Sequence, residues 1–503
     1  MKIDFSSKKQ TKKPIEKSTI NLDIKNFIRD VGLVGVAEFA VAIGGLLLLP
    51  LLTKRIGAYG YGLYQQMLVT IGILSPIASF GLNNALVRFY PAKEKIEEKQ
   101  ELFYSIIVFK LFTSTIIAVL LLIFSKQISN ALFGGANYIV VLTAFIFFIS
   151  SSNIICQFYF RSIRQIKIYA TIRVLDSYSK ISFAYIMIIL GKGIFGVILA
   201  YLLVEIFFTS LYLIIIFYQI GIKIPRFTNL KNWLKYGIPL IPTGLSLWII
   251  SFSDRYVIGY LMGIYHVGIY SAAYTIGFSF FMIMELINFV LVPTISKLYD
   301  NKKYNETKEY LGYVLKFYLL IAIPAVFGLI IFSKDILQIV TTSEIATSAW
   351  MITPIIGACT LFAGVSEVFD KTLRLTKKTS KIGLIITISA IINLVLNFSL
   401  IPIYGIMGAA VATILSYALS AFLMIYFSTK EFRFYIEIKS ILKFFIASIV
   451  MALIGFIWNP VTFISLILCI FVCIGLYFIL LFLLKAFNYK EIRFLIDAVL
   501  FKK

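Results

Sequence analysis

Charged side chains are scarce in this sequence: they make up 14% of 503 residues, whereas soluble domains usually carry about 25%. Hydrophobic residues make up 60%. Apolar runs of about 20 residues recur along the chain, and each can cross a hydrocarbon core about 30 Å thick as a helix. Open strands could not satisfy their backbone groups there. The composition therefore excludes a soluble domain and predicts an all-α, polytopic membrane protein.

Residues that usually carry catalysis or hold metals are also few. His266 is the only histidine, and we interpret it as incidental because it falls in a short loop. The four cysteines, Cys156, Cys359, Cys469 and Cys473, lie in or beside apolar runs. Cys469 and Cys473 share a helical face, but no further Cys or His accompanies them to complete a metal site. We expect no metal, no cofactor and no catalytic residue.

Other absences narrow the classes further. No Gly-x-x-x-x-Gly-Lys-Ser/Thr loop is present, which excludes ATP hydrolysis by that route. The N-terminus is basic and lacks an early apolar segment, so no cleaved signal peptide is expected. A membrane-embedded enzyme, such as a glycan polymerase or an acyltransferase, would need acid/base groups on an exposed face, and the outer loops are too short to provide one. A transporter is favoured over an enzyme.

Acidic residues are half as frequent as basic ones, 24 against 47, giving a net charge of +23. On a membrane protein such an excess indicates which side faces the cytosol rather than nucleic-acid binding. We predict about fourteen spans, near 31–53, 62–84, 101–125, 137–156, 170–190, 194–219, 236–253, 268–293, 309–332, 348–367, 382–401, 406–428, 441–458 and 461–484. Thirty-seven Lys and Arg then fall on one side and six on the other. Both termini are expected in the cytosol, with the protein in a bacterial inner membrane.

Landmarks in the first part of the chain recur in the second. The segment Gly57–Tyr64 (GAYGYGLY) matches Gly263–Tyr270 (GIYHVGIY) at an offset of 206. Gly193 and Gly196 match Gly405 and Gly408 at 212, and Arg161 and Arg164 match Lys371 and Arg374 at 210. Each repeat holds six spans, an even number, so both keep one orientation about an axis along the membrane normal. Substrate would bind between the two. The glycines are interpreted as tight turns, with tyrosines anchoring at the membrane interface.

This repeat predicts a domain organisation. Residues 1–30 would form a basic tail with an interfacial helix, 31–220 a first six-helix lobe, 221–235 an amphipathic cytosolic linker, 236–430 a second lobe, and 431–503 two further helices and a basic tail. Three amphipathic stretches are candidates for helices on the membrane surface. Their apolar residues are Ile20, Ile24, Phe27 and Ile28; Phe227, Leu230 and Leu234; and Ile492, Leu495, Ile496 and Val499.

Several motifs resemble those of the polysaccharide exporter family, the bacterial O-antigen and capsule-repeat flippases of the multidrug/oligosaccharidyl-lipid/polysaccharide exporter superfamily. They are Tyr236-Gly-Ile-Pro-Leu-Ile-Pro242, Ser253-Asp-Arg-Tyr256, Gly268-Ile-Tyr-Ser-Ala-Ala-Tyr274, Leu52-Thr-Lys-Arg-Ile-Gly57, Gly81–Arg88, and Asn397–Pro402 through Gly408. The resemblance covers roughly residues 30 to 485. It implies two six-helix lobes around a central cavity, two extra C-terminal helices, and an undecaprenyl-diphosphate-linked oligosaccharide moved by alternating access.

A phosphate-bearing lipid needs cations at membrane depth, where ionisable groups are expensive and often mark a path. The candidates are Arg88, Lys110, Lys180, Arg255 and Lys316. Lys110 and Lys180 lie about ten residues, or roughly 15 Å, into their spans, where a cavity and an internal ion pair are equal alternatives. Arg88 and Arg255 are placed at span ends, where snorkelling to the headgroups is the alternative.

The carboxylates Glu38, Glu285 and Asp254 are candidates for ion coupling, to H⁺ or Na⁺, or for gating. The alternative is structural ion pairing, for instance Glu38 with Lys110 or Glu205 with Lys180. Asp254 and Arg255 are adjacent and do not face each other on a helix. We therefore expect their partners elsewhere, in the first lobe, where the pair would pin an outer loop or form an outer gate.

Two other transported substrates remain open: a lipid-linked peptidoglycan precursor, and a drug or cation exchanged by an antiporter of the same superfamily. An antiporter for cations would have an acidic cavity, whereas a phosphate-bearing lipid favours a basic one. The expected partners are the lipid bilayer, the lipid-linked glycan and polysaccharide polymerase or assembly machinery.

Overall fold

The computed structural model describes residues 17–458, 460 and 462–486, except for the side chains of 17–31, 285, 289, 290 and 463. All regular secondary structure within these ranges is helical. The elements are α1 Lys17–Ser79, α2 Leu82–Phe89, α3 Ile96–Ile123, α4 Ser125–Leu132, α5 Asn137–Ser162, α6 Ile166–Ile189, α7 Gly193–Ile220, α8 Leu230–Gly237, η1 Ile238–Leu240, α9 Ile241–Met262, α10 Ile264–Phe278, η2 Ser279–Phe281, α11 Met282–Asp300, α12 Tyr304–Val340, α13 Ser343–Ala349, α14 Ile352–Leu375, α15 Thr379–Tyr404, α16 Ile406–Glu431, α17 Ile438–Trp458 and α18 Phe463–Leu483. The predicted all-α membrane fold is confirmed.

The number of spans differs from the sequence prediction for two identifiable reasons. Twelve helices in the described part are long and apolar enough to cross a membrane, not fourteen. The first two predicted spans fall in α1, which is assigned as one helix although its backbone leaves helical geometry at Gly57 (φ 70°, ψ −177°). The predicted span 170–190 corresponds to α6, which carries Arg173, Asp176 and Lys180 and is absent from the twelve. The number of about fourteen stays a prediction.

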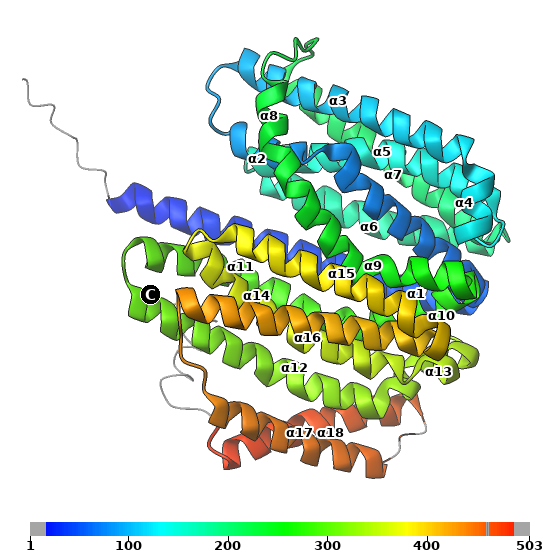
Figure 1. Ribbon diagram of the computed structural model, residues 1–503, viewed down its shortest axis with the longest axis vertical. Coiled ribbons are helices and arrows are strands. Elements are labelled where there is room, and N and C mark those ends of the chain that lie inside the picture. Colours follow the sequence, from blue (N-terminus) through cyan, green and yellow to red (C-terminus); the bar gives the residue numbers. More distant parts are fainter. Residues whose placement is uncertain (1–16, 459, 461, 487–503) are drawn as a thin grey trace, which may run out of the picture.

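Two lobes are built with the same order of packing, and Figure 1 shows them as two groups of helices. In the first lobe (α1 to α7), α5 packs between α3 and α7, and α6 packs between α1 and α7. In the second lobe (α9 to α16), α14 packs between α12 and α16, and α15 packs between α9 and α16. α17 and α18 pack on α12 and lie on the side away from the first lobe (Figure 1). The predicted domain limits stay predictions.

The loops rich in Lys and Arg lie at one end of the bundle, which we call the basic end. Its loops are 90–95, 163–165, 221–229, 301–303, 376–378 and 432–437, and the turns at the opposite end include 133–136, Gly57, Gly263 and Gly405. Gly57 and Gly263 have positive φ angles of 70° and 89°, as the predicted turns require.

The lobes touch most closely at the opposite end, through two glycines that the repeat makes equivalent. A Cβ on Gly62 would lie 2.2 Å from the Ile264 carbonyl oxygen, and one on Gly268 would lie 1.8 Å from the Ala58 carbonyl oxygen. These glycines let two helix backbones cross in contact, and they do not form turns. The neighbouring Tyr270 is buried in a hydrophobic core shared by both lobes, which corrects its assignment as an interfacial anchor.

The predicted linker helix packs on protein. α8 places Trp233 in the core of the first lobe, and Leu230 and Leu234 are partly buried against the same core. A Cβ on Gly237 would lie 2.5 Å from the Phe80 carbonyl oxygen, so α8 lies in backbone contact with the break between α1 and α2. The C-terminal amphipathic stretch lies outside the described residues, as do the side chains of the N-terminal one.

Replacing Gly62 by alanine tests the crossing of the lobes. The new methyl group would overlap backbone atoms of α10, and such overpacking typically costs about 1–3 kcal/mol. We expect Gly62→Ala to lower the thermal unfolding midpoint of the purified protein. Gly45→Ala, in the same helix but with open space around its Cβ, is the matched control and should leave the midpoint unchanged. Equal midpoints for both variants would contradict the close crossing.

Candidate functional site

A cavity of about 270 Å³ lies between the two lobes, toward the basic end. The last turn of α5 supplies Arg161 and the first turns of α6 supply Tyr169. Its full lining is Val34, Gly35, Glu38 and Phe39 of α1, Arg161, Tyr169, and Met282 and Leu286 of α11. Among the side chains that the structure describes, the ionisable groups of the lining come from the first lobe, and Met282 and Leu286 of the second lobe are apolar.

Glu38 is the acidic group of this cavity. The Tyr169 hydroxyl donates a hydrogen bond to Glu38 Oε1 at 2.7 Å, and Arg173 Nε lies 3.8 Å from the same oxygen. Both Glu38 and Arg173 remain about one third exposed at the side chain. Arg161 is exposed and lies over the Phe158 ring, 5.1 Å from its centroid. Arg161 and Glu38 thus lie on the wall of the cavity, and Arg173 lies behind them in contact range of Glu38.

A row of charges continues from the cavity into the first lobe along one face of α6. Tyr169, Arg173, Asp176 and Lys180 are spaced by four, three and four residues, which puts them on one side of a helix. Lys180 Nζ lies 2.9 Å from Asp176 Oδ2 and 2.6 Å from Glu205 Oε2 of α7. Lys180 is therefore neutralised within its own lobe, and its pairing with Glu205 is one of the two structural pairings given as alternatives from the sequence.

This network has one more carboxylate than cations. Among the described residues, Glu38, Asp176 and Glu205 form ion pairs with Arg173 and Lys180, and Arg161 lines the same cavity as Glu38 without pairing with it. Asp176 Oδ1 is buried and accepts no hydrogen bond from the described residues. Because an unneutralised charge is costly at membrane depth, the arrangement favours uptake of one proton or a small cation.

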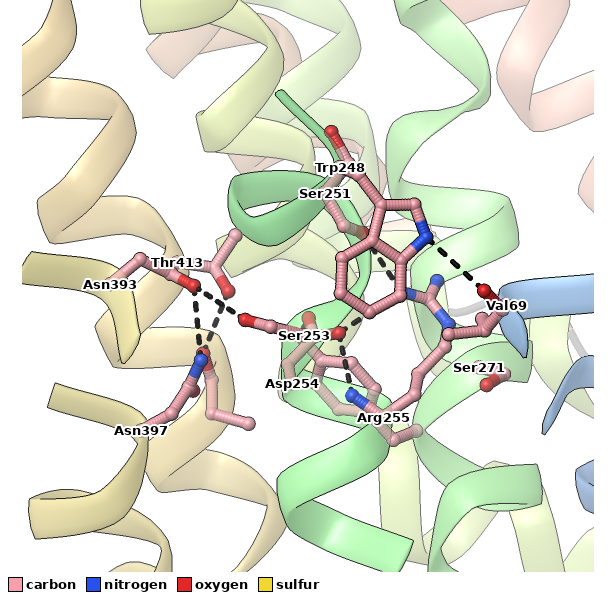
Figure 2. Close-up of polar contacts among 12 residues, drawn as sticks. Val69, Trp248, Ser251, Ser253, Asp254, Arg255, Ser271, Asn393, Asn397 and Thr413 are labelled. Atoms are coloured by element: carbon pink, nitrogen blue, oxygen red, sulfur yellow. Dashed lines mark hydrogen bonds and ion pairs between the residues drawn. The ribbon is translucent and has the colours of Figure 1, made fainter. Parts of the chain in front are cut away.

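The second lobe holds a separate buried pair, shown in Figure 2. Asp254 and Arg255 are 1% and 3% exposed and lie within α9, two turns before its end at Met262. Arg255 Nη1 lies 3.1 Å from Asp254 Oδ1 and donates to the Ser251 carbonyl oxygen at 2.9 Å (Figure 2). The Tyr270 hydroxyl donates to Asp254 Oδ2 at 2.5 Å.

Three predictions for this pair are wrong. The residues do not lie in an outer loop, since α9 extends beyond the predicted span end at 253. They contact each other although they are adjacent, because the long Arg255 side chain folds back onto the Asp254 carboxylate. Their other hydrogen-bond and ring partners in the described part of the chain, including the Tyr274 ring 4.2 Å from the guanidinium, belong to the second lobe. A gating role for the pair stays a prediction.

Buried amides lie beside the pair in Figure 2. Ser253 Oγ donates to Asn393 Oδ1 at 3.1 Å, and Asn397 Nδ2 donates to the same oxygen at 3.0 Å. Asn397 Oδ1 and Asn393 Nδ2 are buried with no partner in the described part of the chain. The second lobe therefore has a polar centre of its own, which composition alone did not reveal.

Lys110 and Arg88 lie on the first lobe without a carboxylate partner among the described residues. Lys110 is 1% exposed, and its Nζ donates to Asn83 Oδ1 at 3.4 Å. The alternative pairing of Glu38 with Lys110 is wrong, because Glu38 contacts Tyr169 and Arg173 instead. Arg88 is exposed on α2, and its role stays a prediction.

Lys316 lies in a second groove and not in the cavity between the lobes. It is buried at the basic end of α12 and pairs with Glu437 at 2.5 Å, in a groove to which the first lobe contributes no residue. Partial burial acts to raise the pKa of Glu437, but the hydrogen bond and charge of Lys316 lower it overall. Lys316 does not line the cavity between the lobes. Glu285 lies on α11, and its side chain is outside the described part.

Sequence reasoning missed Arg161, Tyr169 and Arg173 as site residues. From the sequence, Arg161 is identified only as a landmark of the repeat, and Tyr169 and Arg173 are not singled out. The signal that could have found Tyr169 and Arg173 is the four-three-four spacing of polar residues on α6; no comparable pattern marks Arg161 on α5. Contact of this face with α1 and α7 brings Glu38 and Glu205 to it.

Comparison with known proteins gives matches to two families and to archaeal relatives. A family described as polysaccharide biosynthesis protein matches residues 51–350, and the lipid II flippase MurJ family matches 268–482. A "Probable low-salt glycan biosynthesis flippase" of Haloferax volcanii is 23% identical over 370 residues, covering 74% of this chain and 76% of the relative. An uncharacterized membrane protein of Methanocaldococcus jannaschii is 26% identical over 510 positions, covering 92% and 97%.

Two solved structures share the fold. The lipid II flippase MurJ in an inward closed conformation superposes with a TM-score of 0.74 at 20% identity, covering 89% of this chain and 97% of that one. An inward-facing multidrug resistance transporter of the MATE family gives a TM-score of 0.66 at 15% identity, covering 79% and 97%. The chain therefore has the fold of the MurJ and MATE transporters.

Substituting Lys180 tests the buried network. Lys180→Met leaves Asp176 and Glu205 without their shared cation, and removing one partner of a buried pair typically costs about 3–5 kcal/mol. We expect a strongly lowered thermal unfolding midpoint, with partial recovery when Glu205→Gln is added. Lys192→Met, at an exposed lysine just after α6, is the control. An unchanged midpoint for Lys180→Met would show that the network carries no such stabilisation.

Proposed function

The chain belongs to the polysaccharide biosynthesis protein family, and we propose that it is a flippase that moves a lipid-linked oligosaccharide across the membrane. The observation that carries the proposal is the cavity between the lobes, with a polar wall from the first lobe and an apolar wall from the second. A lipid-linked glycan has the same division, since its phosphate and sugars are polar and its lipid is not. The proposed role is transport without catalysis.

The cations on the polar wall support a phosphate-bearing headgroup. Arginine offers a planar fork of donors that matches phosphate oxygens, and Arg161 and Arg173 lie on either side of Tyr169 in sequence. We propose that these two guanidinium groups hold the phosphates and that the substrate is an undecaprenyl-diphosphate-linked repeat unit. The names of the Haloferax relatives, flippases of glycan biosynthesis, support the substrate class.

The direction of transport follows from the charge of the loops. The positive-inside rule favours the cytosol for the basic end, and we propose that the cavity lies in the cytosolic half of the span. The crossing of Gly62 and Gly268 closes the lobes at the opposite end. We propose that substrate enters from the cytosolic leaflet in this state and leaves after the crossing opens. A bacterial inner membrane, cytosolic termini and contact with polysaccharide polymerase or assembly machinery remain part of the proposal.

The excess carboxylate supports coupling to an ion gradient. Arg173 Nε lies 3.8 Å from Glu38 Oε1. A substrate phosphate that binds the Arg173 guanidinium would displace the Glu38 carboxylate from it. We propose that a proton or Na⁺ taken up by the network of Glu38, Asp176 and Glu205 releases Arg173 for substrate. In this way, the ion and the glycan would bind to linked sites in one lobe.

A lipid-linked peptidoglycan precursor is the second candidate substrate. The match of residues 268–482 to the MurJ family favours it specifically. Both substrates present a lipid diphosphate, so the cavity described here fits either. Complementation of a host that lacks its own peptidoglycan-precursor flippase separates the two, because only the second candidate restores growth.

Removing Arg161 tests the phosphate site. In a native host deleted for the gene, lipid-linked oligosaccharide should accumulate on the cytosolic leaflet, and Arg161→Ala should restore transport poorly. A hydrogen bond to a charged group contributes about 1.5–3 kcal/mol, so at least tenfold slower transport is expected. The transport rate is measured by labelling the glycan that reaches the outer leaflet with a reagent added outside.

The control for Arg161→Ala is Lys167→Ala, which removes an exposed cation at the same end that does not line the cavity. It should restore transport fully at equal protein levels. If the deletion leaves glycan export normal, the proposed function is wrong. If export fails and Arg161→Ala restores it as well as the wild type does, the flippase stands and the phosphate site is wrong.

Cross-linking at the opposite end tests the movement of the lobes. Thr53 Oγ1 lies 3.3 Å from the Val340 carbonyl oxygen, so cysteines at these two positions should join in this state. We expect a short thiol cross-linker between Thr53→Cys and Val340→Cys to stop transport, and reduction to restore it. The background should lack the four native cysteines.

A pair within one lobe is the control for cross-linking. Tyr265 and Glu344, which are hydrogen-bonded to each other at the same end, both belong to the second lobe. Cross-linked cysteines at these positions should leave transport intact. Continued transport through a fully cross-linked Thr53–Val340 pair would contradict an opening at this end.

A further inference from the structure

A second polar groove lies at the basic end, away from the cavity between the lobes. It has a volume of about 550 Å³, twice that of the cavity, and is formed by the first turns of α12 and the segment 433–437 that leads to α17. The lining residues that matter here are Lys308, Tyr313, Lys316, Arg433, Tyr435 and Glu437. Nothing in the proposed transport route uses this groove.

The walls of the groove are fixed in place. A Cβ on Gly312 would lie 2.7 Å from the Tyr435 carbonyl oxygen, so the 433–437 backbone rests directly on α12. Phe434 is buried, and its ring lies 4.8 Å from that of Phe369 on α14. The groove is therefore a preformed feature of the second lobe.

Its carboxylates are engaged while two of its cations are not. Glu437 accepts from Lys316 at 2.5 Å, and Glu309 accepts from the Tyr313 hydroxyl at 2.8 Å. Arg433 is exposed and forms no ion pair or hydrogen bond within the described part of the chain. Lys308 Nζ only approaches the Phe432 ring, 5.3 Å from its centroid. With three cations against two carboxylates, the lining favours an anion.

The surroundings of the groove favour an anion that is attached to a lipid. Tyr435 is 78% exposed, and the next residues outward on α17, Ile438 and Leu442, are 65% and 56% exposed. These apolar side chains lie at the start of a helix long and apolar enough to cross the membrane. The groove therefore opens where the polar end of the protein meets its lipid-facing surface, which is the level of headgroups and of tyrosine anchors.

We propose that this groove binds the phosphate headgroup of an anionic phospholipid from the leaflet at the basic end. Arg433 and Lys308 contact the phosphate, and the acyl chains lie along the exposed face of α17. Basic pockets between helices on the cytoplasmic side are suited to anionic headgroups. The site is distinct from that of the transported lipid, because only α12 and the 433–437 segment contribute to it.

Lipid binding to the purified protein tests the site. Native mass spectrometry would count phosphatidylglycerol and phosphatidylcholine bound to the wild type and to the double variant Lys308→Gln, Arg433→Gln. Each basic residue near a charged surface contributes about 1 kcal/mol, so the double variant should bind phosphatidylglycerol about 30-fold more weakly. The double variant Lys297→Gln, Lys378→Gln, with the same charge change at the same end outside the groove, should bind like the wild type.

Two further arms keep the proposal open to refutation. A photoactivatable phosphatidylglycerol on the wild-type protein should label the peptide containing Arg433 and Tyr435, which requires no variant to fold. Glycerol 3-phosphate at the same concentration should not compete. Equal binding by the groove variant and the control variant, labelling elsewhere only, or competition by glycerol 3-phosphate would each overturn the proposal. A groove variant that still supports glycan transport would leave the proposed function intact.

Discussion

The architecture depends on one constraint: a charge at membrane depth must be neutralised by a neighbour. Each ion pair between described side chains has both partners in the first lobe, or both partners after residue 240, in the second lobe and the segments that follow it. Between the lobes the contacts are uncharged, such as Trp248 Nε1 to the Val69 carbonyl oxygen at 3.2 Å and Tyr256 to Thr70 at 2.8 Å. None of these ion pairs joins the two lobes, so separating the lobes breaks none of them.

That division explains how a transporter can open at one end and close at the other. At Gly62 and Gly268 the two helix backbones cross in close contact, and this contact is stabilised by dispersion. When the lobes separate there, the contact is lost but no buried charge is left unpaired. Glu38, Arg161 and Arg173 all belong to the first lobe, so the phosphate site that we propose lies on one lobe, and the proposed contact with the lipid lies on the other. Movement of the lobes then need not break the polar site.

Much of the fold could be predicted from the sequence, because apolar runs and the sidedness of Lys and Arg report directly on spanning helices. The errors arose where charge enters the membrane. Asp254 and Arg255 were read as a loop because the sequence does not show that each can neutralise the other. The role of Glu38 in ion coupling or gating stays a prediction, and its contact with Tyr169 depends on α1 packing against α6, which no local pattern specifies.

Reconstitution of the purified protein in liposomes shows whether this chain alone moves a lipid-linked glycan between leaflets. Liposomes would contain a polyprenyl-diphosphate oligosaccharide with a fluorescent sugar, and a membrane-impermeant glycosidase added outside would report which molecules reach the outer leaflet. The account predicts that the pool in the inner leaflet becomes accessible at a rate that scales with the amount of protein and falls with Arg161→Ala. The proposed flippase activity would be contradicted if the inner-leaflet glycan became accessible no faster than in protein-free liposomes, although folded protein was present in both orientations.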